Sequence, residues 1–319
     1  MIAASPLGEL LSKRIVLVTG KGGVGKTTVA AALAQAAASA GKRVLAAEIA
    51  SDEAAPSPLA AALGAAASDD DPIDVAPGIR CVRISPSRGH HDFLREAMPV
   101  RFLADAAMRS HAIRQFLRAA PTLSEMGVLY RLLHLSLARR GHEVEHETII
   151  VDLPATGHAL ALTQLPEAIL RLIPGGPIVT AVRAGLALIT DPVKTATIVV
   201  TLPEALPVSE ALELATKLER DRIAVTAFVL NRAPTNLFLA PERAFLDTWL
   251  AGEANVLGVR SLGRIDRAEK ARARLMESRQ GLVFQLPDLP DDASLSTRLF
   301  HALQASVGSS SARAPEARA

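Results

Sequence analysis

Nine consecutive residues at positions 20–28, Gly-Lys-Gly-Gly-Val-Gly-Lys-Thr-Thr, constrain the fold more than any other feature of the chain. They contain the pattern Gly-x-x-x-x-Gly-Lys-Thr, whose fixed positions are Gly20, Gly25, Lys26 and Thr27. The apolar run before the pattern, residues 15–18, predicts a buried strand, and the Ala-rich stretch after it, residues 29–40, predicts a helix. A strand, a glycine-rich loop and a helix in this order are typical of a phosphate-binding unit.

The residue types in this loop explain the chemistry that it predicts. Glycines let consecutive backbone N–H groups turn toward one centre, and the N-terminus of the following helix adds positive potential there. We expect Lys26 to neutralise the β- and γ-phosphates of a nucleotide and the Thr27 hydroxyl to ligate Mg²⁺. The residues expected to contact the nucleotide are Gly20, Lys21, Gly22, Gly23, Val24, Gly25, Lys26, Thr27 and Thr28.

Lys21 stands directly after the first glycine, where an ordinary phosphate loop does not require a basic residue. A lysine there resembles the deviant loop of the class of ATPases that includes MinD, ParA, the nitrogenase iron protein and ArsA. In that class this lysine reaches across a dimer interface to the partner's nucleotide. The resemblance therefore implies a nucleotide-sandwich dimer, with Lys21 and Lys26 as catalytic residues. The alternative for Lys21 is an exposed side chain on a solvated loop.

A second segment resembles the switch II element of this class. Residues 147–151 predict a buried strand, and Asp-Leu-Pro-Ala-Thr-Gly-His follows at 152–158. The heptad is similar to the Asp-x-x-Pro-Thr-Gly-His element of the arsenite-pump ATPase ArsA and of the ATPases that target tail-anchored membrane proteins, with the proline one position early. A carboxylate at a strand end can hold Mg²⁺ through water, so Asp152 is a candidate catalytic residue and indirect magnesium ligand. The candidate switch residues that would sense the γ-phosphate are Asp152, Thr156, Gly157 and His158.

The similarity to bacterial ArsA-like ATPases continues downstream and covers nearly the whole chain. Residues 225–230 predict a strand that ends at Asn231. In the resembled family an Asn at this position contacts the adenine edge; the alternative for Asn231 is turn formation. Residues 284–290 resemble the loop that covers the base, which makes Pro287 a candidate base-binding residue.

Two departures from the family pattern limit what the resemblance implies. In ArsA and the targeting ATPases, a switch I aspartate thought to position the attacking water follows the second strand, but here that position is Ala50. Glu48, Asp52 and Glu53 are nearby carboxylates that do not match it, so we expect hydrolysis that is slow, activated by a partner, or lost. The only cysteine, Cys81, is expected to be a buried apolar residue, which disfavours an arsenite-binding thiol cluster.

Net charge, cysteine content and hydropathy bear on the partners and the location that we expect for the chain. The formal net charge is +2, which favours neither nucleic acid nor an anionic membrane as an obligatory partner. One cysteine is typical of a reducing cytoplasm, where we expect the protein to be located. No apolar run approaches the length of a membrane span, so we expect no stable membrane insertion.

The predicted fold class is α/β: a mostly parallel, doubly wound sheet of the P-loop NTPase type with a helical subdomain. Alternation of apolar runs with helical stretches supports this, and further strands are predicted at 43–47, 79–84 and 195–201. We predict a single ATPase domain over residues 12–307, with a helical subdomain at about 90–140, and a disordered tail at 308–319. The Ala- and Pro-rich segment 54–74 is predicted to be a mobile loop.

These features predict a dimeric ATPase, switched by ATP with Mg²⁺, that moves helices at 91–138 to bind or release a protein client. For the apolar residues of those helices the alternative is core packing against the sheet. One alternative function is a hydrolysis-deficient, nucleotide-binding subunit of a heterodimer with a paralogue. Another is a MinD- or ParA-like positioning ATPase, although the last helical stretch, 295–307, lacks the basic face that membrane or DNA binding would need. The client, and the choice between homodimer and heterodimer, are left open.

Overall fold

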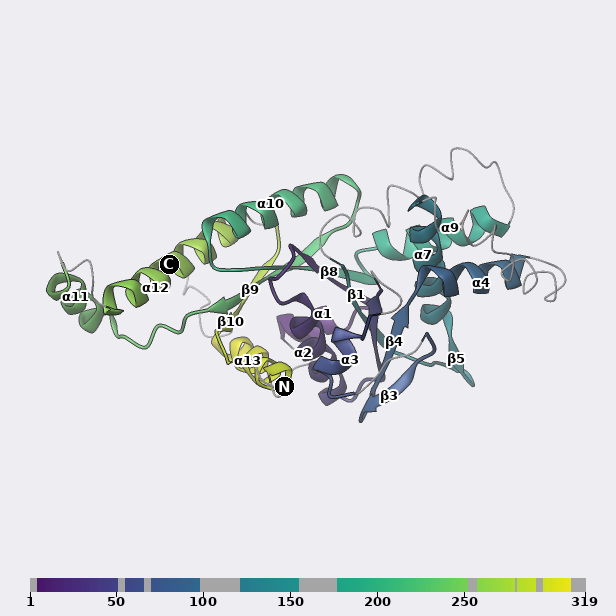
Figure 1. Cartoon of the computed structure of the whole chain (residues 1–319), viewed down its shortest axis with the longest axis horizontal. Coiled ribbons are helices and arrows are strands. Elements are labelled where there is room, and N and C mark those ends of the chain that lie inside the picture. The colour runs from purple at the N-terminus through teal and green to yellow at the C-terminus, as the bar shows by residue number, and fades with distance from the viewer. Residues whose placement is uncertain are drawn as a thin grey trace, which may run out of the picture.

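The computed structural model describes residues 5–50, 55–65, 70–97, 121–154, 177–251, 257–278, 280–290 and 295–310. Eight of the described strands form one sheet in the order β10-β9-β8-β1-β7-β2-β4-β3, and only β3, at one edge, is antiparallel to its neighbour (Figure 1). These strands are β1 (Ile15–Gly20), β2 (Val44–Ile49), β3 (Ile73–Ala76), β4 (Ile79–Ile84), β7 (Thr148–Asp152), β8 (Thr195–Thr201), β9 (Val225–Ala233) and β10 (Leu282–Pro287). The predicted doubly wound, mostly parallel sheet is confirmed.

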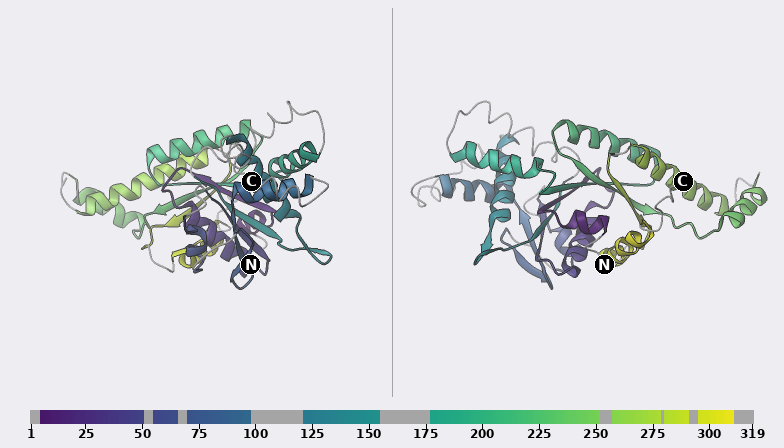
Figure 2. Two further views of the ribbon diagram at one scale, coloured as in Figure 1. Left: turned by 45° about the vertical axis from the view of Figure 1, so that its right-hand side comes forward. Right: turned by 180° about the vertical axis from the view of Figure 1, so that it is seen from behind.

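Helices cover both faces of the sheet, so the central strands are buried on both sides and read as continuous apolar runs (Figures 1 and 2). One face packs against α1 (Pro6–Leu11), α2 (Lys26–Ser39), α3 (Pro58–Ala62) and α13 (Leu295–Ser310). The other face packs against α7 (Pro121–Leu137), α9 (Pro177–Thr190), α10 (Ala205–Arg220) and α12 (Leu257–Glu277). The small side chains of α2 allow it to lie close to the sheet, and eight of its residues are buried.

The remaining described elements are peripheral. They are α4 (Pro86–Ala97), α11 (Ala240–Trp249), and a two-stranded ribbon of β5 (Arg139–Arg140) and β6 (Glu143–Val144). Helix α11 has no buried residue and lies at the end of the molecule farthest from α4 and α9 (Figure 1). The large side chains exposed on this segment include Leu237, Leu239, Phe245 and Trp249.

Helix α7, in the described part of the predicted helical subdomain, packs as core. Helix α7 buries Val128, Leu129, Leu132 and Leu135 against the sheet, and it contacts α4 closely where Gly89 meets the backbone of Gly127. These α7 residues therefore follow the core-packing alternative rather than an open client surface. Residues 98–120, the middle of the predicted subdomain, lie outside the described residues.

Two predictions made from composition differ from the structure. The segment 54–74 is not simply a loop, because residues 58–62 form α3, whose first turn is capped by the Ser57 hydroxyl, and β3 begins at Ile73. Helix α13 continues to Ser310, three residues into the predicted tail, and 311–319 lie outside the described residues. Ser57 at the N-cap and Pro58 at the first helical position are local signals of a helix. The prediction of a loop relied on the Ala- and Pro-rich composition and did not use these signals.

Candidate functional site

The glycine-rich loop lies where the sheet changes direction. It follows β1, which pairs with β8 on one side and β7 on the other, and such switch points bind ligands at the carboxyl ends of the strands. Gly20, Gly23 and Gly25 all have positive φ, between 80° and 147°. A Cβ at Gly20 would collide with the Val200 carbonyl oxygen, and one at Gly25 would collide with the Asn231 side chain. The loop therefore requires glycine for both its backbone shape and its close packing.

Both predicted lysines lie at this loop. Lys26 is the first residue of α2, is half-buried, and donates a hydrogen bond from Nζ to the Lys21 carbonyl oxygen at 3.0 Å. Burial lowers the pKa of Lys26, and the nearby Asp152 carboxylate opposes this effect. Lys21 is exposed, and its Nζ contacts Oε1 of Glu210 on α10 at 2.6 Å. Lys21 is thus held within its own chain by an ion pair that the sequence did not reveal.

Thr27 and Asp152 connect the two predicted motifs. The Thr27 hydroxyl donates to Asp152 Oδ2 at 2.6 Å across 125 residues of sequence. Burial raises the pKa of Asp152 from 3.8 to about 6, and the Glu48 carboxylate adds to the rise, while the Thr27 hydrogen bond and the Lys26 charge oppose it. The other carboxylate oxygen, Oδ1, is buried and has no hydrogen-bond partner in the described part of the chain. The carboxylate is therefore incompletely compensated and suited to receive a cation or its water.

Asn231 supports the loop from the neighbouring strand β9. It is buried, and its Nδ2 donates to the Val24 carbonyl oxygen at 2.9 Å. The sequence predicted that the strand ends at Asn231, but β9 continues to Ala233. Asn231 also lines a narrow hollow beside the loop, and the residues lining it are Gly25, Thr28, Asn231, Arg232, Pro287, Leu289 and Leu299. The structure thus brings the two predicted base-binding residues, Asn231 and Pro287, to the same place as the start of α2.

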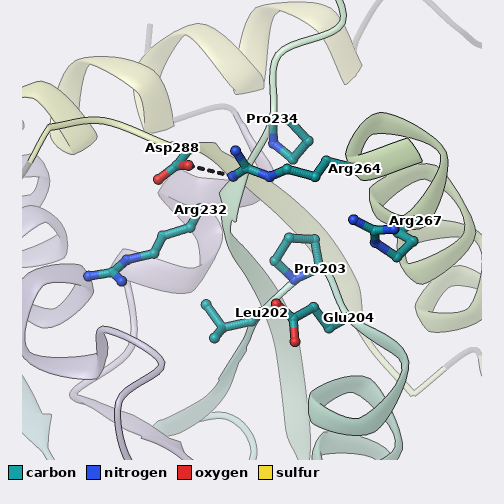
Figure 3. A pocket seen from close by; sticks show the side chains of 8 residues that line it. All are labelled: Leu202, Pro203, Glu204, Arg232, Pro234, Arg264, Arg267 and Asp288. Carbon is teal, nitrogen blue, oxygen red and sulfur yellow. Dashed lines mark hydrogen bonds and ion pairs between the residues drawn. The ribbon is translucent and has the colours of Figure 1, made fainter. Parts of the chain in front are cut away.

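A larger hollow of about 390 Å³ lies at the ends of β8, β9 and β10, and Arg232 lines it as well as the first hollow (Figure 3). Its other lining residues are Leu202, Pro203, Glu204, Pro234, Arg264, Arg267 and Asp288. Arg264 and Asp288 form an ion pair at 2.8 Å on its rim. Two carboxylates accompany the three arginines, so this hollow has no strong excess of either charge.

The switch I position offers no replacement for the missing aspartate in the described residues. Ala50 is buried, and its backbone N–H donates to Ile84, which extends the sheet ladder. Glu48 lies beside Asp152 in the sheet register, but its Oε2 accepts hydrogen bonds from the Ser57 hydroxyl and the Leu59 N–H. Glu48 therefore anchors the start of α3. Residues 51–54, which include Asp52 and Glu53, lie outside the described residues.

The predicted switch II element is described only in part. Asp152, Leu153 and Pro154 are described, whereas Thr156, Gly157 and His158 lie outside the described residues. Their proposed sensing role stays a prediction. Cys81 is fully buried, and burial raises the pKa of its thiol to about 12, as expected for an unreactive core residue.

Sequence reasoning missed two charged residues near the loop, Glu210 and Arg232. Glu210 contacts Lys21 from 189 positions away, a pairing that no local pattern indicates. Arg232 directly follows the predicted base-binding residue Asn231, and that adjacency was the available signal.

Comparison with known families agrees with this geometry. Residues 13–174 match the model of the ArsA ATPase family, described as anion-transporting ATPases. This match spans half of the chain and contains both the phosphate loop and Asp152. The chain belongs to the ArsA ATPase family. The family assignment predicted from Lys21 and the 152–158 heptad is therefore confirmed, and with it membership of a group of nucleotide-binding ATPases.

Individual relatives in curated collections are distant. The chain is 28% identical to ATPase BagA of Mycobacterium tuberculosis over 236 residues. This aligned segment covers 70% of this chain and 66% of BagA. It is 35% identical to the uncharacterized protein SCO2128 of Streptomyces coelicolor over 170 residues. This second aligned segment covers 50% of this chain and 40% of SCO2128. The aligned part thus spans just under two thirds of the length of BagA. Among the described helices, none is both long and apolar enough to cross a membrane.

Proposed function

We propose that this ArsA-family chain is a dimeric ATPase in which ATP binding and hydrolysis open and close a helical, partner-binding surface. The observation that carries the proposal is the contact of Thr27 with Asp152, because it joins the phosphate loop and the start of switch II at one strand edge. A nucleotide bound there would contact both motifs at once. Differential binding of ATP and ADP to open and closed states is sufficient to drive such a switch.

The residues at this edge fit Mg²⁺. The buried Asp152 Oδ1 lacks a partner in the described part of the chain, and the Thr27 hydroxyl lies beside the other carboxylate oxygen. No group of three His, Cys, Asp or Glu side chains gathers as a metal site among the described residues. This suits Mg²⁺, which ATPases hold with one or two protein ligands, phosphate oxygens and water. When bound, Mg²⁺ would neutralise phosphate charge; Thr27 and Asp152 would fix its position, and Lys26 would add positive charge at the β- and γ-phosphates.

The proposed dimer uses Lys21 in trans. In the single chain Lys21 contacts Glu210, and both side chains are partly exposed, so the ion pair is weak enough to exchange for the phosphates of a partner's nucleotide. The moving partner surface is proposed to include the helices at 91–138, whose central part is outside the described residues. The proposed location is the cytoplasm, because the only cysteine is a buried free thiol.

A second candidate function is favoured by one observation. Ala50 provides no carboxylate at the switch I position, and Glu48 is committed to α3. The chain would then bind ATP tightly without turning it over and would act as one subunit of a heterodimer with an active paralogue.

The test is ATP binding and steady-state turnover by the purified chain with Mg²⁺, with Lys26→Ala as the blank. The proposal expects ATP binding that falls at least about a hundredfold in Lys26→Ala, since the charge-assisted contacts of Lys26 to two phosphates are lost. Turnover above the blank supports the cycling ATPase, and tight binding without turnover supports the paralogue subunit. Equal ATP binding by the chain and by Lys26→Ala contradicts both.

A further inference from the structure

Strand β9 carries one extra residue beside the phosphate loop. The register with β10 shifts between Leu230 and Ala233, so that Asn231 and Arg232 together face a single residue of β10. Such an insertion is a β-bulge, which is rare between parallel strands, is frequent next to active sites and re-aims side chains. Successive side chains of a regular strand point to opposite faces. Here Asn231, which is buried, and Arg232, which is exposed, line the same hollow.

Arg232 has a backbone conformation that a non-glycine residue in a strand rarely adopts. Its φ is +54°, in the left-handed region. The other non-glycine residue with positive φ in the described chain is Arg222, at +62°, where α10 ends and the Ile223 N–H donates to Leu218. Left-handed residues are common at helix ends, so Arg222 has a local explanation. The left-handed conformation of Arg232 belongs instead to the bulge in β9, and strain of this kind concentrates at functional sites.

The Arg232 side chain lies beside the phosphate loop without a protein partner in the described part of the chain. It lines the narrow hollow with Asn231, Pro287 and Thr28, and it makes no hydrogen bond or ion pair within the described part of the chain. In Figure 3 its guanidinium points away from Arg264 and Arg267, toward the purple ribbons of the N-terminal part of the chain. Pro287, Leu289 and Leu299 give the hollow an apolar side, and an unpaired planar cation at its rim is suited to an aromatic ligand face.

We propose that Arg232 is a base-binding residue: the bulge directs it over the hollow, where its stem and guanidinium cover the face of the bound adenine. The proposal rests on the ATP site proposed above and adds a residue to it. Asn231 supports the phosphate loop through its hydrogen bond to the Val24 carbonyl oxygen, while Arg232 covers the solvent side of the hollow. The strained backbone is retained because an unstrained strand would turn the Arg232 side chain away from this hollow.

The experiment measures binding of ATP and of inorganic tripolyphosphate by calorimetry to the chain and to three variants. Arg232→Gly removes the side chain and keeps the left-handed backbone, which glycine adopts freely. Arg232→Lys keeps the charge and removes the planar guanidinium. Arg222→Gly is the matched control, because it makes the same change at a left-handed arginine away from the loop. Thermal melts check that each variant is folded.

We expect Arg232→Gly to bind ATP about tenfold more weakly and tripolyphosphate unchanged, since only the base contact is lost. The ATP affinity of Arg232→Lys should lie between those of Arg232→Gly and the unaltered chain. Arg222→Gly should bind both ligands as tightly as the unaltered chain does. Unchanged ATP affinity in Arg232→Gly, or equal losses for ATP and tripolyphosphate, overturns the base contact. Failure of the unaltered chain to bind ATP would instead overturn the proposed function, so the two failures are distinguishable.

Discussion

At the scale of single residues, the largest electrostatic perturbation at the site is the burial of the Asp152 carboxylate. It lies beside Glu48 in the sheet and receives one hydrogen bond, from Thr27. Its pKa of about 6 means that the folded chain binds a proton at Asp152 more tightly than the unfolded chain does. Without a nucleotide, the stability of the fold therefore falls as the pH rises from about 4 to about 6, and the loss is complete above that range.

Asp152→Asn should remove this loss, because asparagine carries no charge at any of these pH values and can still accept the Thr27 hydrogen bond. Above pH 6 we expect the nucleotide-free variant to be more stable than the unaltered chain, by at most about 3 kcal/mol. Magnesium-dependent ATP binding should weaken in the same variant. Thermal melts from pH 4 to pH 8 test the first effect, and parallel pH curves for the two proteins would contradict it.

Contacts between distant residues were the part of the site that the sequence could not predict. The loop residues 20–28 form a local motif, so their strand, turn and helix followed from neighbours in the chain. Lys21 and Glu210 are adjacent only because β8 lies beside β1 and leads into α10. Asn231 was predicted to contact the base, and its hydrogen bond to the Val24 carbonyl oxygen joins residues 207 positions apart.

At the scale of elements, apolar runs identified β1, β2, β4, β7, β8 and β9, because a parallel sheet covered on both faces needs such runs. The prediction of a loop at 284–290 was wrong for its first part, since residues 284–287 belong to β10, an edge strand with several exposed or half-buried residues. The strands predicted at 79–84 and 195–201 match β4 and β8 at both ends. Helix α3 was missed because its five residues are too few to show helical periodicity. Its position depends on Glu48, which is eleven residues before Leu59.

A buried ion pair adds to the close packing of α7 against α4. Arg131 on α7 is 4% exposed and contacts Asp92 Oδ2 of α4 at 2.6 Å and Asp71 Oδ1 at 3.0 Å. It also donates to the Asp70 carbonyl oxygen at 2.6 Å. One side chain thus joins a helix on the sheet, a peripheral helix and the loop before β3.

Arg131→Met should lower the free energy of unfolding by about 3 kcal/mol, because it leaves the Asp92 carboxylate partly buried without its closest cation. Arg88 offers a matched control, since it contacts the same two aspartates but is 34% exposed. We expect Arg88→Met to cost about 1 kcal/mol or less. Urea unfolding measures both values, and equal losses would contradict a special role for the buried arginine.

At the scale of the whole molecule, the sheet places the phosphate loop, Asp152 and the β9 bulge along one edge. The phosphate loop follows β1, Asp152 ends β7 and the bulge lies near the end of β9, and these strands are parallel neighbours in the order β9-β8-β1-β7. Ligands of such sheets bind at the carboxyl ends of the strands. The exposed position of Lys21 on this edge is what the proposed dimer requires.

The measurement that tests this account most directly is the mass of the chain in solution by light scattering, with and without ATP and Mg²⁺. We predict 33.6 kDa without nucleotide and twice that mass with it. Lys21→Ala should still bind ATP, because Lys26 and the loop glycines remain, but should stay at the mass of one chain. A mass that does not change with saturating ATP and Mg²⁺, or a doubling that Lys21→Ala leaves intact, would contradict a dimer joined through Lys21.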